Sequence, residues 1–289
     1  MNSFDFVVDK NNLDLTFNDG IFRGYVEGSD SGEALMGVGV KEFPQELYIP
    51  ESDWDDWIRE NDKHECWPEN YSSRFTHQGN SHECVYHCRT QCFETTYNQM
   101  VGMEHCVWTS PLAGYRHDKG PNGQIGGANV EESLKHAMSV GMLPEHDGPE
   151  WLGGKGGQVK HFKHTVNQTA GRSEDHWPTK GWPRELPEGW EQTSKHFIVL
   201  EAFWIPNQDA HVSAILRRRA VGNGRSGHSI PHVRIVKDSS GKYYSRYKDS
   251  YTVFRQDSLG MTGNGYCINA VKIPSDPKKP AGADMKEAT

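Results

Sequence analysis

Two kinds of periodicity occupy different halves of this chain, and their order limits what it can fold into. Helical spacing runs through residues 84–103 and again through 129–141, where Asn129 and Glu132 form a capping pattern. Strand-like runs dominate the second half, at residues 197–204, 233–236, 243–247 and 266–273, and one short helix is expected at 208–218. Helices followed by strands, rather than alternating with them, predict an α+β fold.

The chain divides into an arm, a main domain and a tail. Alternating apolar residues in 1–50, such as those at 4, 6, 8 and at 36, 38, 40, predict strands and extended segments. We expect one domain over 51–273, with a helical lobe at about 51–150, a long connection at about 151–192 and a β lobe at about 193–273. Residues 274–289, rich in Pro, Lys and Ala, are expected to form a disordered tail.

Composition excludes several classes of partner. The formal net charge of −8 argues against a nucleic-acid interface, which needs a basic surface. The start of the chain lacks a secretory pattern, and no run of 18 apolar residues suggests a membrane helix. We therefore expect a non-secreted, cytoplasmic protein whose six cysteines are thiols rather than disulfides.

Cys84 lies where a reactive thiol is favoured. It follows the expected N-cap Ser81 by three residues, and the amides at a helix N-terminus stabilise a thiolate. Six residues upstream, Gln78 begins the string Gln78-Gly79-Asn80-Ser81-His82-Glu83-Cys84. A lone cysteine in a first helical turn is more often a buried structural residue, so its partners elsewhere in the chain decide its meaning.

Three further strings accompany it. His228 stands in Gly227-His228-Ser229-Ile230, which lies 144 residues after Cys84, and Asp249 stands in Lys248-Asp249-Ser250-Tyr251. Gly126 and Gly127 lead into the second predicted helix. Glycine pairs of this kind occur where another backbone must approach closely.

Together these strings resemble those of the papain-like cysteine peptidases, in family order and over residues 50–273. The resemblance implies a two-lobed fold, with the cysteine on a helical lobe and the His/Asp pair on an antiparallel β lobe. It also implies a Cys84 nucleophile, a His228 base oriented by Asp249 in place of the family's Asn, and a Gln78 amide for the oxyanion. Gly126 and Gly127 would bind a peptide or protein substrate, and neither a cofactor nor a metal would be needed.

The neighbours of Cys84 depart from that pattern. His82 and Glu83 replace small residues, Val85 replaces an aromatic, and a carboxylate beside a thiol opposes its ionisation. An alternative is therefore a catalytically weak or inactive structural subunit of a large assembly, such as a viral particle. In that alternative, residues 1–50 and 274–289 would contact neighbouring subunits.

Two other chemistries stay open. Transglutaminase or amidase reactions use the same Cys-His-Asp set, and the sequence does not separate them from peptide hydrolysis. A zinc site is suggested by the thiols and imidazoles crowded at residues 64, 66, 77, 82, 84, 87, 88 and 92. However, Cys84, Cys88 and Cys92 recur at successive helical turns, which is more typical of a packed helix face.

Overall fold

The computed structural model describes residues 7–8, 30–72, 82–119, 127–144, 189–225, 227–250, 254–259, 264–274 and 285–287. Its helices are α1 (Gly32–Gly37), α2 (Trp54–Lys63), α3 (Pro68–Tyr71), α4 (Cys84–Val101), α5 (Pro111–Lys119), α6 (Val130–Ser139), α7 (Trp190–Ser194) and α8 (Gln208–Leu216). Its strands are β1 (Val7–Val8), β2 (Lys41–Glu42), β3 (Val199–Ile205), β4 (Val221–Arg225), β5 (His228–Lys237), β6 (Tyr243–Lys248), β7 (Phe254–Ser258), β8 (Gly265–Pro274) and β9 (Met285–Glu287).

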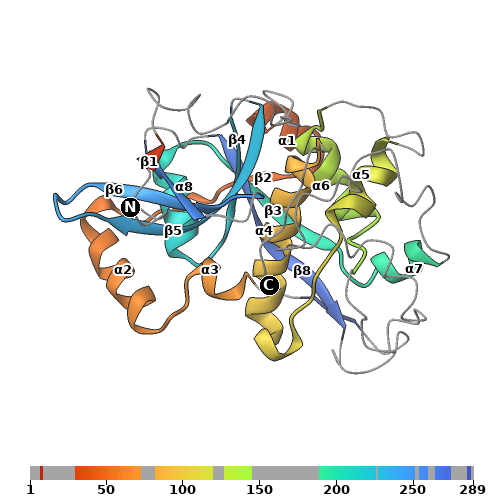
Figure 1. Cartoon of the computed structure of the whole chain (residues 1–289), viewed down its shortest axis with the longest axis horizontal. Helices are drawn as coiled ribbons and strands as arrows, with labels where there is room; N and C mark the ends of the chain where they lie inside the picture. Colours follow the sequence, from red (N-terminus) through yellow and green to blue (C-terminus); the bar gives the residue numbers. More distant parts are fainter. Residues whose placement is uncertain are drawn as a thin grey trace.

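One sheet organises the molecule. Its strands lie in the order β1-β7-β6-β5-β4-β8-β3-β2, and β9 adds to β8. The inner pairs are antiparallel, whereas β1 and β2 join the two ends in parallel. The α4 helix packs against β5 and β8 on one side, while α5 and α6 pack on its other side (Figure 1). The predicted α+β architecture, with helices beside a largely antiparallel sheet, is confirmed.

The α4 helix is buried on nearly all sides, from Cys84 to Asn98. Its thiols Cys84, Cys88 and Cys92 belong to the apolar core, as their spacing indicates. Its polar residues tie neighbouring loops to the helix, since buried polar groups need hydrogen-bond partners. For example, Glu94 accepts a hydrogen bond from the Thr109 amide at 2.6 Å. This helix is therefore the fixed element from which the site is built.

A second core cluster lies under α8, on the opposite face of the sheet from α4. It brings together apolar residues of α2, α8 and strands β3, β4, β5 and β8. The N-cap Asn207 starts α8 by accepting a hydrogen bond from the Ala210 amide at 2.9 Å. Neighbouring residues of β8, Tyr266 and Cys267, belong to the two different clusters, so the sheet is covered by apolar side chains on both faces.

The ends of the chain differ in part from the sequence-based expectation. The alternation at 36–40 predicted a strand, but residues 36 and 37 belong to α1, because Ser31 caps that helix by accepting from the Ala34 amide. The predicted tail contributes β9, which pairs with β8 at Lys272–Pro274. Strand pairing offers backbone hydrogen bonds that local composition does not reveal. Residues 151–188 of the predicted connection lie outside the described residues. The α7 helix begins within the last residues of that predicted connection.

None of the described helices combines the length and the apolarity required to cross a bilayer.

Candidate active site

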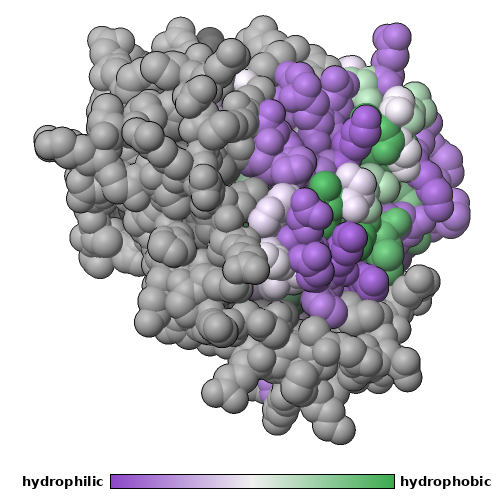
Figure 2. Space-filling view, turned by 90° about the vertical axis from the view of Figure 1, so that its right-hand side faces the viewer, coloured by the Kyte–Doolittle hydropathy of each residue, from purple (hydrophilic) through white to green (hydrophobic). Residues whose placement is uncertain are grey.

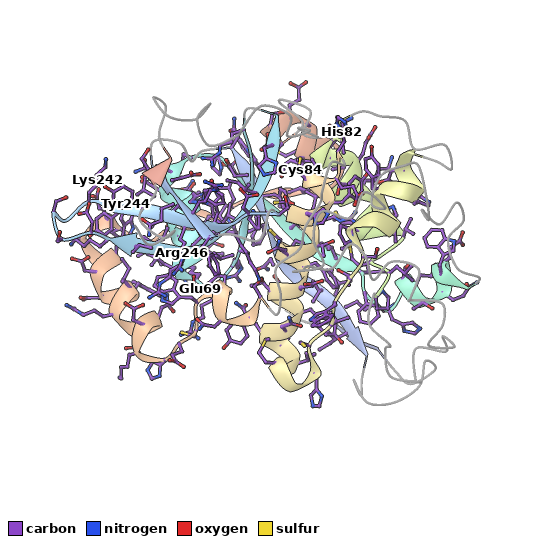
Figure 3. The ribbon with its side chains drawn as sticks, viewed as in Figure 1. Glu69, His82, Cys84, Lys242, Tyr244 and Arg246 are labelled. Carbon is purple, nitrogen blue, oxygen red and sulfur yellow. The ribbon has the colours of Figure 1, made fainter. Side chains whose placement is uncertain are left out.

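Cys84 is the first residue of α4, and its thiol is fully buried. The helix begins after Glu83 rather than at the predicted cap Ser81, which lies outside the described residues. The unpaired amides of an 18-residue helix surround this end, so a negative charge on sulfur is stabilised there. Figure 3 shows Cys84 and His82 at the same end of α4.

The Glu83 carboxylate beside the thiol faces another partner. Its Oε2 lies 3.6 Å from Nε2 of His87, one helical turn further along α4. Both side chains are buried, with exposures of 3% and 1%. The Glu83 carboxylate therefore faces an imidazole of its own helix.

A tight turn of the sheet positions His228. Arg225 at the end of β4 pairs with His228 at the start of β5, and Gly227 between them has a φ of 75°. Only glycine adopts this left-handed conformation without strain, which explains the Gly-His pair in the sequence. His228 thereby projects from the first position of β5, toward the helix that carries Cys84.

Asp249 reaches the same histidine from the neighbouring strand. Strands β5 and β6 are antiparallel, with His232 opposite Tyr247, so the start of β5 lies beside the end of β6. Nε2 of His228 lies 3.2 Å from Oδ1 of Asp249, and both residues are buried. The sheet register thus assembles the predicted His/Asp pair.

The electrostatics favour a charged imidazole. Burial lowers the pKa of His228, but hydrogen bonds to Asp249 and Cys84, together with the charges of both groups, raise it to about 9. For Asp249, burial raises the pKa, yet the bond to His228 and the charges of His228, Arg255 and Arg225 hold it below its usual value. At neutral pH the raised pKa of His228 and the lowered pKa of Asp249 therefore favour an imidazolium beside a carboxylate.

Two arginines near Asp249 were not foreseen from the sequence. Nε of Arg255 lies 3.5 Å from Oδ2 of Asp249, on the carboxylate oxygen that His228 leaves free. Arg225 acts on Asp249 through its charge. Arg225 stands three residues before His228 in the same hairpin. The pairing of β4 with β5 places Arg225 directly opposite His228, which the sequence alone does not show.

The remaining predicted site residues are only partly described. Gln78 and Gly126 lie outside the described residues, so their oxyanion and substrate-binding roles stay predictions. Gly127 is half-buried and precedes Asn129, which starts α6 as predicted, though without a side-chain cap. The structure therefore brings together Cys84, His228 and Asp249 of the predicted set.

The suggested zinc cluster is not assembled among the residues that the structure describes. His64 is exposed and lies 2.8 Å from Glu60, whereas the Cys66 thiol lies 3.1 Å from the Asn61 side-chain oxygen. Over the described ranges, none of the residues suggested for that cluster belongs to a group of convergent metal ligands. The crowding of His and Cys in the sequence reflects a buried helix face and separate surface contacts.

The known proteins to which this chain is similar are solved structures. No family model matches the sequence, and no curated protein matches it. Among solved structures, a ragweed pollen cysteine protease in its proform is similar at 12% identity and a TM-score of 0.44, over 69% of this chain and 62% of that chain. This chain thus spans less than two thirds of that protein.

Two further solved structures are matched over a larger share of their own length. Xylellain, a cysteine protease from Xylella fastidiosa, matches at 11% identity and a TM-score of 0.47, over 68% of this chain and 82% of that one. A procathepsin B from Trypanosoma congolense matches at 10% identity and a TM-score of 0.44, over 91% and 98% of the two chains. At such low identities, the chemistry of this chain has to be judged from the geometry of its own residues.

Proposed function

We propose that the chain is a papain-like cysteine peptidase that hydrolyses peptide bonds. The observation that carries the proposal is the series Cys84, His228 and Asp249, in which a thiol at a helix N-terminus is hydrogen-bonded to an imidazole held by a buried carboxylate. These are the parts that nucleophilic acyl transfer requires.

In the proposed reaction the Cys84 sulfur attacks the carbonyl carbon of a peptide bond, and a sulfur–carbon bond forms. The His228 imidazolium then gives its proton to the leaving amine as the carbon–nitrogen bond breaks. In the second step neutral His228 takes a proton from water, whose oxygen attacks the thioester and releases the acid and the Cys84 thiolate. The Cys84 amide and the Gln78 side chain are assigned to the oxyanion.

Labelling of Cys84 by an epoxide-type thiol-protease inhibitor tests this proposal. We expect the inhibitor to modify Cys84, because its ring is opened by a thiolate paired with an imidazolium, and mass mapping locates the adduct. Cys106 is the matched control, since it is the one described cysteine that is not fully buried. Labelling of Cys106 by iodoacetamide, with Cys84 untouched by the epoxide, would remove the peptidase proposal.

A second candidate function is the inactive structural subunit. The observation that favours it is the burial of the nucleophile and the base, both at 0% exposure. A substrate must then displace the chain that covers them before attack, whereas a structural protein needs no access. Absence of epoxide labelling together with self-association of the purified chain would support this candidate over the peptidase.

The pH dependence of hydrolysis is the next prediction. Because the pKa of His228 is raised to about 9, the imidazolium persists through neutral pH and hydrolysis should fall as pH rises through about 9. Replacing Asp249 with asparagine removes a carboxylate that raises this pKa but keeps a hydrogen-bonding side chain. The alkaline limb of the pH profile of kcat/KM should then move to lower pH by roughly one unit.

The control for this prediction is Asp238→Asn. Asp238 is an exposed turn residue that accepts hydrogen bonds from Ser240 and Lys242, far from the site in the sheet. Its replacement should leave the alkaline limb unchanged. If Asp249→Asn also leaves the limb unchanged, Asp249 does not set the protonation of the base.

A further inference from the structure

A second cluster of functional groups lies on the helical side, apart from the Cys84 series. Nδ1 of His117 and Nδ1 of His136 lie 2.8 and 2.9 Å from Oδ1 of Asp118, and the two nitrogens lie 3.0 Å from each other. His117 and Asp118 come from the last turn of α5, and His136 comes from the last turn of α6. Three potential ligand atoms therefore meet in a nearly equilateral triangle.

Hydrogen bonding alone explains this triangle poorly. If both imidazoles donated to Oδ1, their two protons would approach one oxygen at an angle of about 60°, which is too narrow for two lone pairs. A hydrogen bond between the two nitrogens would use the one Nδ1 proton that the pair then holds, so neither nitrogen would have a proton left for the carboxylate. A cation above the triangle would use all three lone pairs at once.

We propose that His117, Asp118 and His136 form a Zn²⁺ site. Two imidazoles and a carboxylate are a preferred ligand set for Zn²⁺, whereas Mg²⁺ and Ca²⁺ prefer oxygen ligands. An ion about 2.1 Å from each atom would see them at angles of roughly 90°, as on one face of a coordination shell. Water would complete the remaining positions.

The surroundings of the triangle fit a metal site. The Tyr86 hydroxyl donates to Oδ2 of Asp118 at 2.5 Å, which orients the carboxylate and leaves Oδ1 for the ion. His136 is buried, which holds its ring in place beside Asp118. The Trp190 ring of α7 lies 5.2 Å from the His117 ring and restricts its motion.

Access to the triangle and the charges around it are also compatible with a bound Zn²⁺. The side-chain exposures of His117, Asp118 and His136 are 37%, 14% and 5%, so the triangle is open on the His117 side. Figure 2 views the side of the molecule on which α5, α6 and α7 lie in Figure 1, and most of the coloured residues there are hydrophilic. The ends of α5 and α6 add the negative pole of each helix, while the Arg89 charge opposes a cation and Asp118 offsets it.

The site can be tested on the full chain carrying Cys84→Ala, which keeps Zn²⁺ away from the nucleophile. Equilibrium dialysis against Zn²⁺ at neutral pH should show one bound ion per chain. His117→Ala in this background should weaken binding by about 100-fold, and Tyr86→Phe should weaken it by about 10-fold. Because His117 is partly exposed, its removal leaves the core intact, which a thermal melt verifies.

His64→Ala provides the matched control. His64 is also an exposed histidine beside a carboxylate, Glu60 at 2.8 Å, but it lacks a third ligand in the described part of the chain. Its replacement should leave Zn²⁺ binding unchanged. Co²⁺ substituted for Zn²⁺ should give visible bands without a thiolate charge-transfer band, because no cysteine belongs to the triangle.

Three results would overturn the proposal. They are no bound Zn²⁺ in the Cys84→Ala chain, equal affinity in the chain carrying His117→Ala as well, and a thiolate charge-transfer band with Co²⁺. None of these results depends on peptidase activity, so the metal site and the proposed function stand or fall separately.

Discussion

Replacing His228 with alanine should lower kcat/KM for peptide hydrolysis by about 10⁴-fold or more. The variant loses the imidazolium that protonates the leaving amine in the proposed reaction and that hydrogen-bonds Cys84. The residues proposed to bind the oxyanion and the substrate are unchanged, so a small residual rate should persist above the uncatalysed one. The measurement is hydrolysis of a fluorogenic peptide library by the wild-type and variant chains, with folding checked by circular dichroism.

The double variant Cys84→Ala with His228→Ala serves as the control for the mechanism. Residues that act as one unit lose activity together, so the double variant should be no slower than either single variant. Since His228 is buried, His228→Gln provides a second variant that fills more of the space left by the ring. Independent, multiplicative losses, or wild-type hydrolysis by His228→Gln, would contradict a shared Cys84–His228 mechanism.

The second large effect concerns stability and lies deeper in the sheet. Arg225 forms an ion pair with Asp257, and the two side chains are 7% and 0% exposed. His232 lies 3.4 Å from the same carboxylate and hydrogen-bonds Ser245 at 2.8 Å. Replacing Arg225 with methionine keeps much of the volume but leaves a buried carboxylate without its cation. The free energy of unfolding should fall by about 3–5 kcal/mol.

The size of this effect should depend on pH. Burial is the main influence that raises the pKa of Asp257 to about 7, and Arg225 acts against that rise. Without Arg225 the pKa rises further, so the native variant takes up a proton as pH falls through a value above 7 and the destabilising charge is lost. The loss of stability should therefore be larger at pH 8 than at pH 5.5, as measured by urea denaturation at both values.

Arg234→Met is the matched control for Arg225→Met. Arg234 also pairs with carboxylates, Asp62 and Glu69, but its side chain is 29% exposed. Its replacement should cost about 1 kcal/mol or less, because water screens the exposed ion pairs. Equal losses in the two variants, or a loss at Arg225 that does not change with pH, would show that Asp257 is not held by Arg225 as a buried ion.

The central helix and the triad were accessible to sequence reasoning because local and distant signals agreed. The thiol spacing places Cys84 at the start of α4, and the Gly-His pair marks the hairpin that presents His228. The string Lys248-Asp249-Ser250-Tyr251 indicated Asp249 through its resemblance to the papain-like peptidases, and Asp249 directly follows β6. Each of these features depends on a few neighbouring residues.

Other features of the structure could not be predicted from the sequence. The alternation at 36–40 predicted a strand, but capping by Ser31 a few residues earlier produced α1. The histidines and cysteines at 64–92 suggested zinc, yet their side chains face separate environments. The His117, Asp118 and His136 triangle has no close sequence signal, since two ligands end one helix and the third ends the next.

The sequence by itself determined the α+β class and the segments that become β3, β5, β6, β8 and α8, though not β4 or β7, and its motifs indicated Cys84, His228 and Asp249 through the family resemblance. Those properties follow from periodicity and short motifs, which act over a few residues. Tertiary structure decided the pairing of β4 with β5 and of β5 with β6, the enclosure of Arg225 and Asp257, and the meeting of α5 with α6. Contacts between distant segments depend on packing and burial, and these set both the charge of His228 and the proposed Zn²⁺ site.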